Sequence, residues 1–285
     1  MIERKIPHIA TILKQVRRRP SSLRGSRPSA IYRALASWPG AKNHLPVFFK
    51  IFDPRLQNKA FFNELLCNRL AKAVGLPVPD DVRLCACKKA LMIGPRRFMD
   101  NRDPDSEWIA GVASVDADPK GVIQLIRSGP DRLLEAELHR WRHLAKVAVF
   151  DELILNVDRN RNNLHRIGKG QFILIDHVDA FGGPDWKLED LEKRLKKPSA
   201  KNDVANFIAE SSNEDTKAQM LIIADHFARN LEITGGFLDI DFLAFDRLYQ
   251  LEDGTTQSIV DLLNRRRAIL PEMLFYHLKA GQLFQ

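Results

Sequence analysis

Short runs of alternating apolar and polar residues dominate the first 115 residues of the chain, and this pattern predicts strands. The predicted strands lie at 29–36, 45–51, 82–88, 90–93 and 108–114. One longer apolar stripe at helical spacing predicts a helix over 57–74, with Gly75 and Pro77 as its stop signal. A second, shorter stripe predicts an amphipathic helix over 8–18. The N-terminal part is therefore expected to be a small sheet with one long helix.

Beyond residue 115 the apolar spacing becomes mostly helical. A helical pattern begins at Pro130 and continues to Leu155, as one or two helices. A polar loop over 156–170 and an apolar strand over 171–176 follow. Further helices are predicted at about 186–196, 201–211, 214–231, 239–250, 255–267 and 270–280. The predicted class is α+β, with a sheet-rich lobe before a mostly helical lobe.

The composition is that of a globular protein rather than a membrane or secreted one. Of the 285 residues, 45% are hydrophobic and 28% are charged. No run reaches the ~18 apolar residues that span a bilayer, and the first residues lack the apolar region of a secretory signal. Three cysteines, expected to be buried structural thiols, fit a reducing compartment. A cytoplasmic protein without a membrane span is expected.

The net charge of +8 resides in the N-terminal segment. Residues 1–34 hold nine Lys and Arg against one acid, and the remaining residues are balanced. Such a basic segment is typical of proteins that bind an anionic ligand, a phosphate-rich partner or nucleic acid. A solvated helix face explains the same charges equally well.

Three polar residues near the predicted strand 171–176 point to phosphoryl transfer. Asp158 and Asn163 lie five residues apart in the loop, and Asp176 ends the strand. Transfer of a phosphoryl group requires a proton acceptor, an amide oxygen for a metal ion, and a carboxylate that bridges metal and phosphate. The alternative is an ordinary polar turn beside a strand, because Asn and Asp favour turns.

Two upstream residues complete a set typical of kinases. Lys50 lies on the predicted strand 45–51, and Glu64 follows on the predicted helix 57–74. Kinases hold the nucleotide phosphates with a strand lysine that a helix glutamate keeps in place. Each residue alone would be unremarkable as an exposed charge. Their order before Asp158, Asn163 and Asp176 predicts a nucleotide cleft between the two lobes.

At this point the chain resembles the HipA-like kinases, relatives of protein kinases and of the phosphoinositide kinase superfamily. The resemblance covers roughly residues 22–280. It runs through Gly25-Ser-Arg-Pro28, Val47-Phe-Phe-Lys50, Asn63-Glu64-Leu, Gly75-Leu-Pro-Val-Pro79, Asn156-Val-Asp158-Arg-Asn-Arg-Asn-Asn163 and Ile175-Asp176-His177.

This resemblance implies a two-lobed protein-kinase-like fold that uses ATP and Mg²⁺. A basic arm or helix would cover residues 1–20, the N-lobe 21–115 and the C-lobe 116–285. Lys50 would hold the α- and β-phosphates, and Glu64 would orient it. Asp158 would accept the substrate proton, while Asn163 and Asp176 would coordinate Mg²⁺.

The resemblance also places the phosphate loop around Gly25, Ser26 and Arg27, where backbone N–H groups would meet the phosphates. The chain departs from the kinase patterns in three places, the first being a phosphate loop with only one glycine. Asn160 stands where the family commonly has His, and His177 follows Asp176 where protein kinases carry a Phe-Gly switch.

Several neighbouring residues leave the assignment open. Asn162 is a rival to Asn163, and Asp179 is a weaker rival to Asp176. His177 is interpreted as a packed histidine at the strand end, and Arg159 is expected to pair with a carboxylate. Trp141 and Trp186 are interpreted as packing residues.

Three functions fit these observations. The first is a kinase that transfers the γ-phosphate of ATP to a Ser/Thr hydroxyl of a protein, as a HipA-type toxin or a regulator with an antitoxin or other partner protein. The second keeps the chemistry but uses a small molecule or a phosphoinositide as acceptor. The third is a non-catalytic pseudokinase or nucleic-acid-binding regulator that uses residues 1–34.

Overall fold

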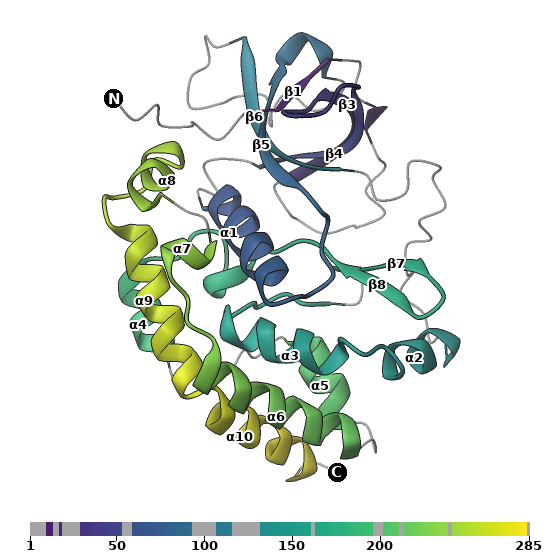
Figure 1. Cartoon of the computed structure of the whole chain (residues 1–285), viewed down its shortest axis with the longest axis vertical. Coiled ribbons are helices and arrows are strands. Elements are labelled where there is room, and N and C mark those ends of the chain that lie inside the picture. Colours follow the sequence, from purple (N-terminus) through teal and green to yellow (C-terminus); the bar gives the residue numbers. More distant parts are fainter. Residues whose placement is uncertain are drawn as a thin grey trace.

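The computed structural model describes residues 10–13, 17–18, 29–52, 59–92, 107–115, 132–160, 163–195, 202–210, 214–238 and 241–283. A group of strands forms one end of the molecule and a group of helices forms the other, with helix α1 between them (Figure 1). The predicted order, a sheet-rich part before a mostly helical part, is confirmed. The predicted boundary between residues 115 and 116 borders the undescribed residues 116–131, so it stays a prediction.

Five strands of the N-terminal part close into a barrel. The six strands here are β1 (Ala10–Ile12), β2 (Arg17–Arg18), β3 (Ser29–Ser37), β4 (Leu45–Phe52), β5 (Val82–Lys88) and β6 (Trp108–Val115). They pair in the order β1-β5-β6-β4-β3-β2, and β1 also pairs with β3. This second pairing of β1 closes the ring, and β2 pairs with the same edge of β3 as β1 does, opposite β4. Closure removes the sheet edges at β1 and β3 that an open sheet would expose.

Three sequence-based expectations in this chain are wrong. The helix expected over 8–18 is replaced, where the chain is described, by strands β1 and β2. The strand expected at 90–93 begins instead as the 3₁₀ turn Lys89–Leu91. The loop expected over 156–170 contains strand β7 (Leu164–Gly168), which pairs with β8 (Gln171–Leu174). β1 and β2 pair with strands elsewhere in the chain, and β7 pairs with its hairpin neighbour β8, so strand pairing overrides the local spacing at these two places.

Alternation along the strands separates a barrel interior from an outer face. On β4, Val47, Phe49 and Ile51 are buried in the barrel core, whereas Lys50 lies between them and points to the opposite face. Lys50 is paired in register with Val112 of β6, which packs in the other hydrophobic cluster with α1. The pleat therefore directs Lys50 out of the barrel and toward α1.

Gly111 on β6 makes room for the Phe49 ring of the barrel core. A Cβ atom there would lie 2.2 Å from the Phe49 ring and 2.6 Å from the Lys50 carbonyl oxygen. Neither neighbour can move far, because both belong to a central strand. Gly111 is therefore required for the close approach of β4 and β6 beside Lys50.

Helix α1 (Ala60–Ala73) packs between the barrel and the helical part. Phe62, Leu65, Leu66 and Leu70 are buried, as the apolar stripe predicts. The helix ends where expected: Gly75 has a φ of +73°, and the Leu76 N–H donates to the Ala71 carbonyl. A glycine in this left-handed conformation after the last turn is a common helix stop.

The helical part is built around α3 (Leu144–Leu153), in which every residue except Lys146 is buried. The predicted helices after residue 130 are confirmed with shifted ends, and the short α7 lies between two of the predicted ranges. The others are α2 (Arg132–His139), α4 (Leu188–Arg194), α5 (Asp203–Glu210), α6 (Glu214–Asn230), α7 (Gly235–Leu238), α8 (Phe242–Leu248), α9 (Thr255–Ala268) and α10 (Leu270–Leu283).

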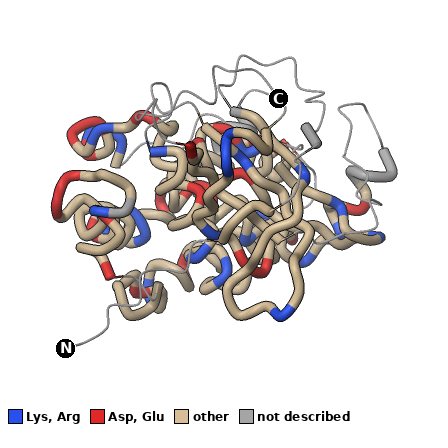
Figure 2. Tube along the Cα trace, turned by 90° about the horizontal axis from the view of Figure 1, so that it is seen from above, with Lys and Arg blue, Asp and Glu red and all other residues tan. Residues whose placement is uncertain are grey.

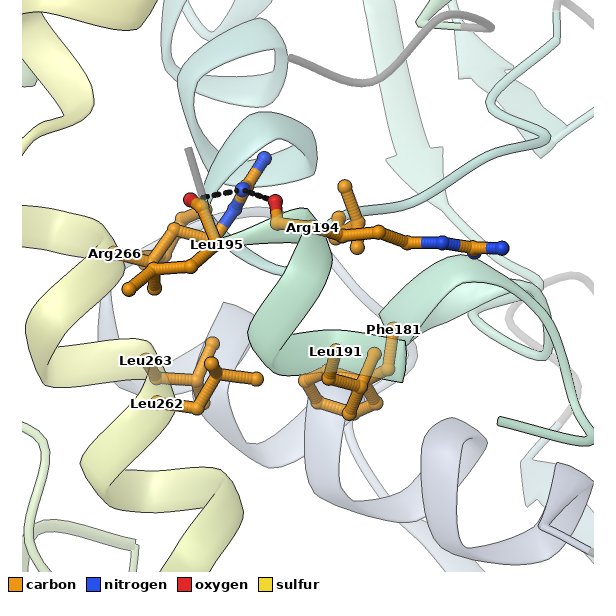
Figure 3. Close-up of a pocket in the computed structure, with 9 residues that line it drawn as sticks. Phe181, Leu191, Arg194, Leu195, Leu262, Leu263 and Arg266 are labelled. Carbon is orange, nitrogen blue, oxygen red and sulfur yellow. Dashed lines mark hydrogen bonds between the residues drawn. The ribbon is translucent and has the colours of Figure 1, made fainter. Parts of the chain in front are cut away.

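A buried charge pair joins α3 to α9. Arg266 is 2% exposed and Glu152 is fully buried, with 3.6 Å between Arg266 Nη2 and Glu152 Oε2. Arg266 also donates to the carbonyls of Glu152, Arg194 and Leu195, so it fastens the end of α4 as well. Figure 3 shows Arg266 reaching these last two carbonyls beside an apolar pocket. Burial lowers the pKa of Arg266 to about 10, and the Glu152 charge opposes this shift.

Charged residues of both signs are interspersed over the described part of the chain (Figure 2). This agrees with the balance of residues 35–285, and most of the basic segment 1–34 lies outside the described residues. Among the described helices, none is long and apolar enough to cross a membrane.

Removing the buried arginine should destabilise the protein far more than removing its exposed neighbour. We expect Arg266→Ala to lower the free energy of unfolding by about 3–5 kcal/mol, because Glu152 is left buried without its cation. Arg265 pairs with Glu192 on the surface, so Arg265→Ala should cost less than about 1 kcal/mol. Urea denaturation of both variants measures the difference. An equal decrease in the free energy of unfolding in the two variants would show that the buried pair contributes no more to stability than the exposed one.

Candidate active site

The loop that carries Asp158 begins at the end of α3 in a strained turn. Leu155 has a φ of 50°, and the N–H of Asn156 donates to the Asp151 carbonyl. A left-handed residue without glycine costs about 1–2 kcal/mol. The Asn156 side chain offsets this by donating to Asp151 Oδ1 and accepting from the Asp158 N–H. The turn thus aims the chain out of the buried α3 toward the sheet.

The carbonyl of Asp158 is the centre of the next turn. It accepts from the Asn160 N–H at 3.0 Å, from Asn160 Nδ2 at 3.4 Å and from Asn163 Nδ2 at 2.8 Å. Asn160 therefore supports the loop at the position where the family commonly has His. Asn163 donates its amide nitrogen to this carbonyl, so its amide oxygen is not used in the turn.

Asp176 lies two residues beyond the end of β8 rather than on the strand. Its φ of 64° is left-handed, a conformation that Asp adopts more readily than most residues. The N–H of Ile175, just before it, donates to the Asn163 carbonyl at 3.0 Å. The two candidate metal-binding residues, Asn163 and Asp176, are therefore held on adjacent backbone segments.

Lys50 and Asp176 meet at the junction of the barrel and the helical part. Lys50 Nζ lies 2.6 Å from Asp176 Oδ1, and the two side chains are 13% and 20% exposed. Lys50 also lies 5.1 Å from the centre of the Phe52 ring. A lysine from a strand and an acid 126 positions later in the chain thus form one charge pair.

Glu64 reaches the same place from α1 but uses its carboxylate on the backbone. Its Oε2 accepts from the N–H of His177 at 2.6 Å. Burial raises the pKa of Glu64, and the Lys50 ammonium opposes this rise while the Asp176 charge adds to it. Glu64 is therefore bonded to the backbone N–H of His177, next to the acid that contacts Lys50. Its expected role of orienting Lys50 stays a prediction.

The Arg159 side chain bonds to both backbone segments of the site, the one at Asn163 and the one at Ile175. It is fully buried, and its Nε lies 2.9 Å from Asp151 Oδ2, which confirms the expected carboxylate partner. Its Nη1 donates to the carbonyls of Asn163 and Ile175 at 3.3 and 2.7 Å. Its Nη2 lies 3.1 Å from His177 Nδ1. One guanidinium therefore contacts both backbone segments of the site and the end of α3.

His177 is a packed histidine, as predicted. It is 1% exposed and lies edge-on to the Phe150 ring, 6.0 Å between centroids. Burial lowers the pKa of His177 well below its usual value, and the Arg159 charge adds to this effect. Because arginine only donates, His177 Nδ1 must accept, which places the proton on Nε2.

The structure brings together five of the predicted residues: Lys50, Glu64, Asp158, Asn163 and Asp176. It does not describe the predicted phosphate loop, Gly25, Ser26 and Arg27, and the rival Asn162 also lies outside the described residues.

The backbone carbonyl of Asp179 accepts from the Val157 N–H at 3.1 Å, so it fastens its segment to the Asp158 loop. The rivalry of its side chain with Asp176 as a metal ligand stays a prediction. Trp141 and Trp186 are each 5% exposed and pack on aromatic neighbours, as expected. Cys67, Cys85 and Cys87 are buried free thiols.

The donor set fits Mg²⁺ better than a metal that proteins enclose completely. Asp176 offers a carboxylate and Asn163 an amide oxygen, the hard ligands that Mg²⁺ takes. Within the described residues, no group of three or more His, Cys, Asp or Glu could hold a metal ion. Mg²⁺ is commonly bound by one or two protein oxygens together with substrate phosphates and water, so Asn163 and Asp176 would suit it. Their binding of Mg²⁺ stays a prediction.

Sequence reasoning missed the structural roles of two residues. Asn63 is fully buried on α1 and contacts the segment after Asp176, and Asp151 is the buried partner of Arg159. Both are polar residues inside apolar helices, which is the signal that the sequence offers. A polar residue at a buried helix position must find a partner, but the sequence does not say which.

Comparison with known protein families identifies a kinase family. The family model described as HipA-like kinase matches residues 48–231, well over half of the chain, and this span includes Lys50, Glu64, Asp158, Asn163 and Asp176. No curated protein sequence matches the chain. The family match agrees with the resemblance carried by the sequence motifs and with the residues that the fold brings together. The chain therefore belongs to the HipA-like kinase family.

Proposed function

We propose that this kinase transfers the γ-phosphate of ATP, with Mg²⁺, to a Ser/Thr hydroxyl of a protein. The observation that carries the proposal is the 2.6 Å contact between Lys50 of the barrel and Asp176 of the C-terminal part, beside the Asp158–Asn163 loop. Phosphoryl transfer depends on positioning and on charge rather than on covalent chemistry by the protein. Lys50, Asp158 and Asp176, fixed at one junction, would supply both the positioning and the charge.

Each residue has a defined task in the proposal. Lys50 holds the α- and β-phosphates by its ammonium charge, and Glu64 keeps the 176–177 backbone in place. Asp158 accepts the proton of the attacking hydroxyl. Asn163 and Asp176 hold Mg²⁺, which when bound neutralises charge on the phosphates. The Lys50–Asp176 pair then marks the place where the phosphates bind.

The barrel with α1 and the helical part would be the N-lobe and C-lobe of a two-lobed kinase. The site residues support this arrangement, because Lys50 comes from β4, Glu64 from α1, and the other three from the loops around β7 and β8. ATP would bind at the junction, with residues 24–27 as the phosphate loop.

A protein hydroxyl is the acceptor in this proposal, and HipA-type toxins are the precedent that supports it. An antitoxin or other regulatory protein would then be a partner. The basic residues 1–34 offer a contact for an anionic surface of either protein, and this contact would weaken as the salt concentration rises.

Asp158 should be essential for phosphoryl transfer but not for folding. We expect Asp158→Asn to lower the rate by about 10²–10⁴, because the hydroxyl loses its proton acceptor. Transfer from labelled ATP with Mg²⁺ to proteins of a cell lysate measures the rate. Asp190→Asn, a change of an exposed acid on α4, is the matched control.

Labelling of lipid or metabolite acceptors instead of protein would replace the proposed acceptor class. A wild-type rate equal to that of Asp158→Asn, with every acceptor class supplied, would contradict catalysis by this loop.

ATP with Mg²⁺ should stabilise the wild-type protein against heat. Binding to the native state alone adds about 2.7 kcal/mol at a hundredfold excess over Kd. We expect Lys50→Met to lose most of this stabilisation, while Lys88→Met, an exposed lysine of β5, keeps it. Asp176→Asn should lose the part that depends on Mg²⁺, measured as the difference with and without a chelator. Wild type that gains no stability from ATP would argue against every nucleotide-dependent function.

A further inference from the structure

The segment after Asp176 is attached to α1 at many points. The amide of Asn63 faces three of its carbonyls: Nδ2 lies 2.6 Å from the Val178 oxygen, 2.9 Å from that of Ala180 and 3.1 Å from that of Gly183. Asn63 Oδ1 accepts from Trp186 Nε1 at 2.9 Å. Asn63 is fully buried, so these contacts replace water on both ends of the amide.

Neighbouring residues of α1 extend this attachment in both directions along the segment. Glu64, the next residue, accepts from the His177 N–H. The N–H of Lys59, at the start of the helix, donates to the Pro184 carbonyl, and its ammonium lies over the Trp186 ring. Contacts from residues 59–64 are thus distributed along the chain from 177 to 186.

The opposite side of the segment is fastened to the loop before Asp158. The N–H of Phe181 donates to the Ile154 carbonyl at 2.8 Å, and the N–H of Gly182 donates to the Leu155 carbonyl at 3.0 Å. Phe181 has a φ of 58°, a strained value for an aromatic residue. Strain of this kind persists only where surrounding contacts impose it, and Asn63 and the 154–155 carbonyls are those contacts.

The sequence of the segment removes one common means of control. In many kinases, phosphorylation of a hydroxyl in the segment after the metal-binding Asp orders that segment. Here no Ser, Thr or Tyr occurs between Asp176 and Ser199. The contacts from α1 already supply the order that a phosphate would create.

We propose that Asn63 is a positioning residue, which locks residues 177–186 onto α1 and so holds Asp176 in place without phosphorylation of this segment. The proposal deepens the proposed function and rests on it for the consequence at Asp176. Its structural part, that the Asn63 amide keeps the segment docked, does not depend on ATP. In consequence α1 and the segment move as one unit, and regulation must act elsewhere.

Hydrogen–deuterium exchange of the free protein tests the structural part. In Asn63→Ala we expect amides of residues 177–186 to exchange at least about tenfold faster than in wild type, since several buried hydrogen bonds are lost together. Trp186→Phe removes the indole N–H donor and part of the ring that Lys59 and Phe181 contact, but it keeps the Asn63 contacts to the three carbonyls. It should therefore give a smaller increase in the same peptides. Leu66→Ala is the matched control, because Leu66 is a buried residue of α1 outside these contacts.

The pattern of exchange separates a latch from a general loss of stability. Leu66→Ala should raise exchange across the molecule without favouring 177–186. Unchanged exchange of 177–186 in Asn63→Ala, or an increase no larger there than elsewhere, would overturn the proposal. If Asn63→Ala does not fold, the exchange of Trp186→Phe is compared with wild type by the same criterion.

Mg²⁺ dependence tests the consequence for Asp176. We expect Asn63→Ala to raise the Mg²⁺ concentration at half-maximal ATP-dependent stabilisation by about tenfold, the factor by which outer contacts commonly tune a metal site. Leu66→Ala should leave that concentration unchanged. Faster exchange with unaltered Mg²⁺ dependence would refute the positioning of Asp176. If ATP does not stabilise the wild-type protein, the proposed function is refuted. The docking of residues 177–186 by Asn63 is then still judged by hydrogen–deuterium exchange, which does not depend on ATP.

Discussion

The buried guanidinium of Arg159 is the interaction on which the rest of the site depends. Arg159 is fully buried and contacts Asp151, the carbonyls of Asn163 and Ile175, and His177. A charge in such a place is costly unless every donor has a partner, and its planar fork satisfies several partners at once. Together with the Ile175 N–H bond to the Asn163 carbonyl, this cation holds the Asp158 loop and the Asp176 segment next to each other.

The same junction concentrates backbone strain. Leu155, Asp176 and Phe181 all have left-handed φ values of 50–64° without being glycine. At or next to each of them, a backbone N–H donates to a backbone carbonyl. These bonds run from Asn156 to Asp151, from Ile175 to Asn163 and from Phe181 to Ile154. Strain that is imposed by neighbouring contacts is a common property of functional sites, because it fixes side chains in positions that a relaxed chain would leave.

Local patterns predicted most elements well. The strands 82–88 and 108–115 and the helix 60–73 lie where alternation or helical spacing placed them. The errors at 8–18 and 156–170 fall where a short segment pairs with another strand. The apolar residues around Ala10–Ile12 are spaced as in a helix. The segment is nevertheless a strand, because its backbone hydrogen-bonds to both β3 and β5. Barrel closure is likewise a property of pairing, which no single strand records.

The sequence by itself singled out the candidate residues for phosphoryl transfer: Lys50, Glu64, Asp158, Asn163 and Asp176 stand out by residue type, order and spacing, because those features match what that reaction requires. Only the tertiary structure decided how they are held. Lys50 pairs with Asp176, Glu64 acts on the His177 backbone, and Asn63 fastens the chain beyond it. These contacts join residues more than a hundred positions apart in the chain. A buried polar group requires a partner, but its local sequence does not identify which distant residue will supply one.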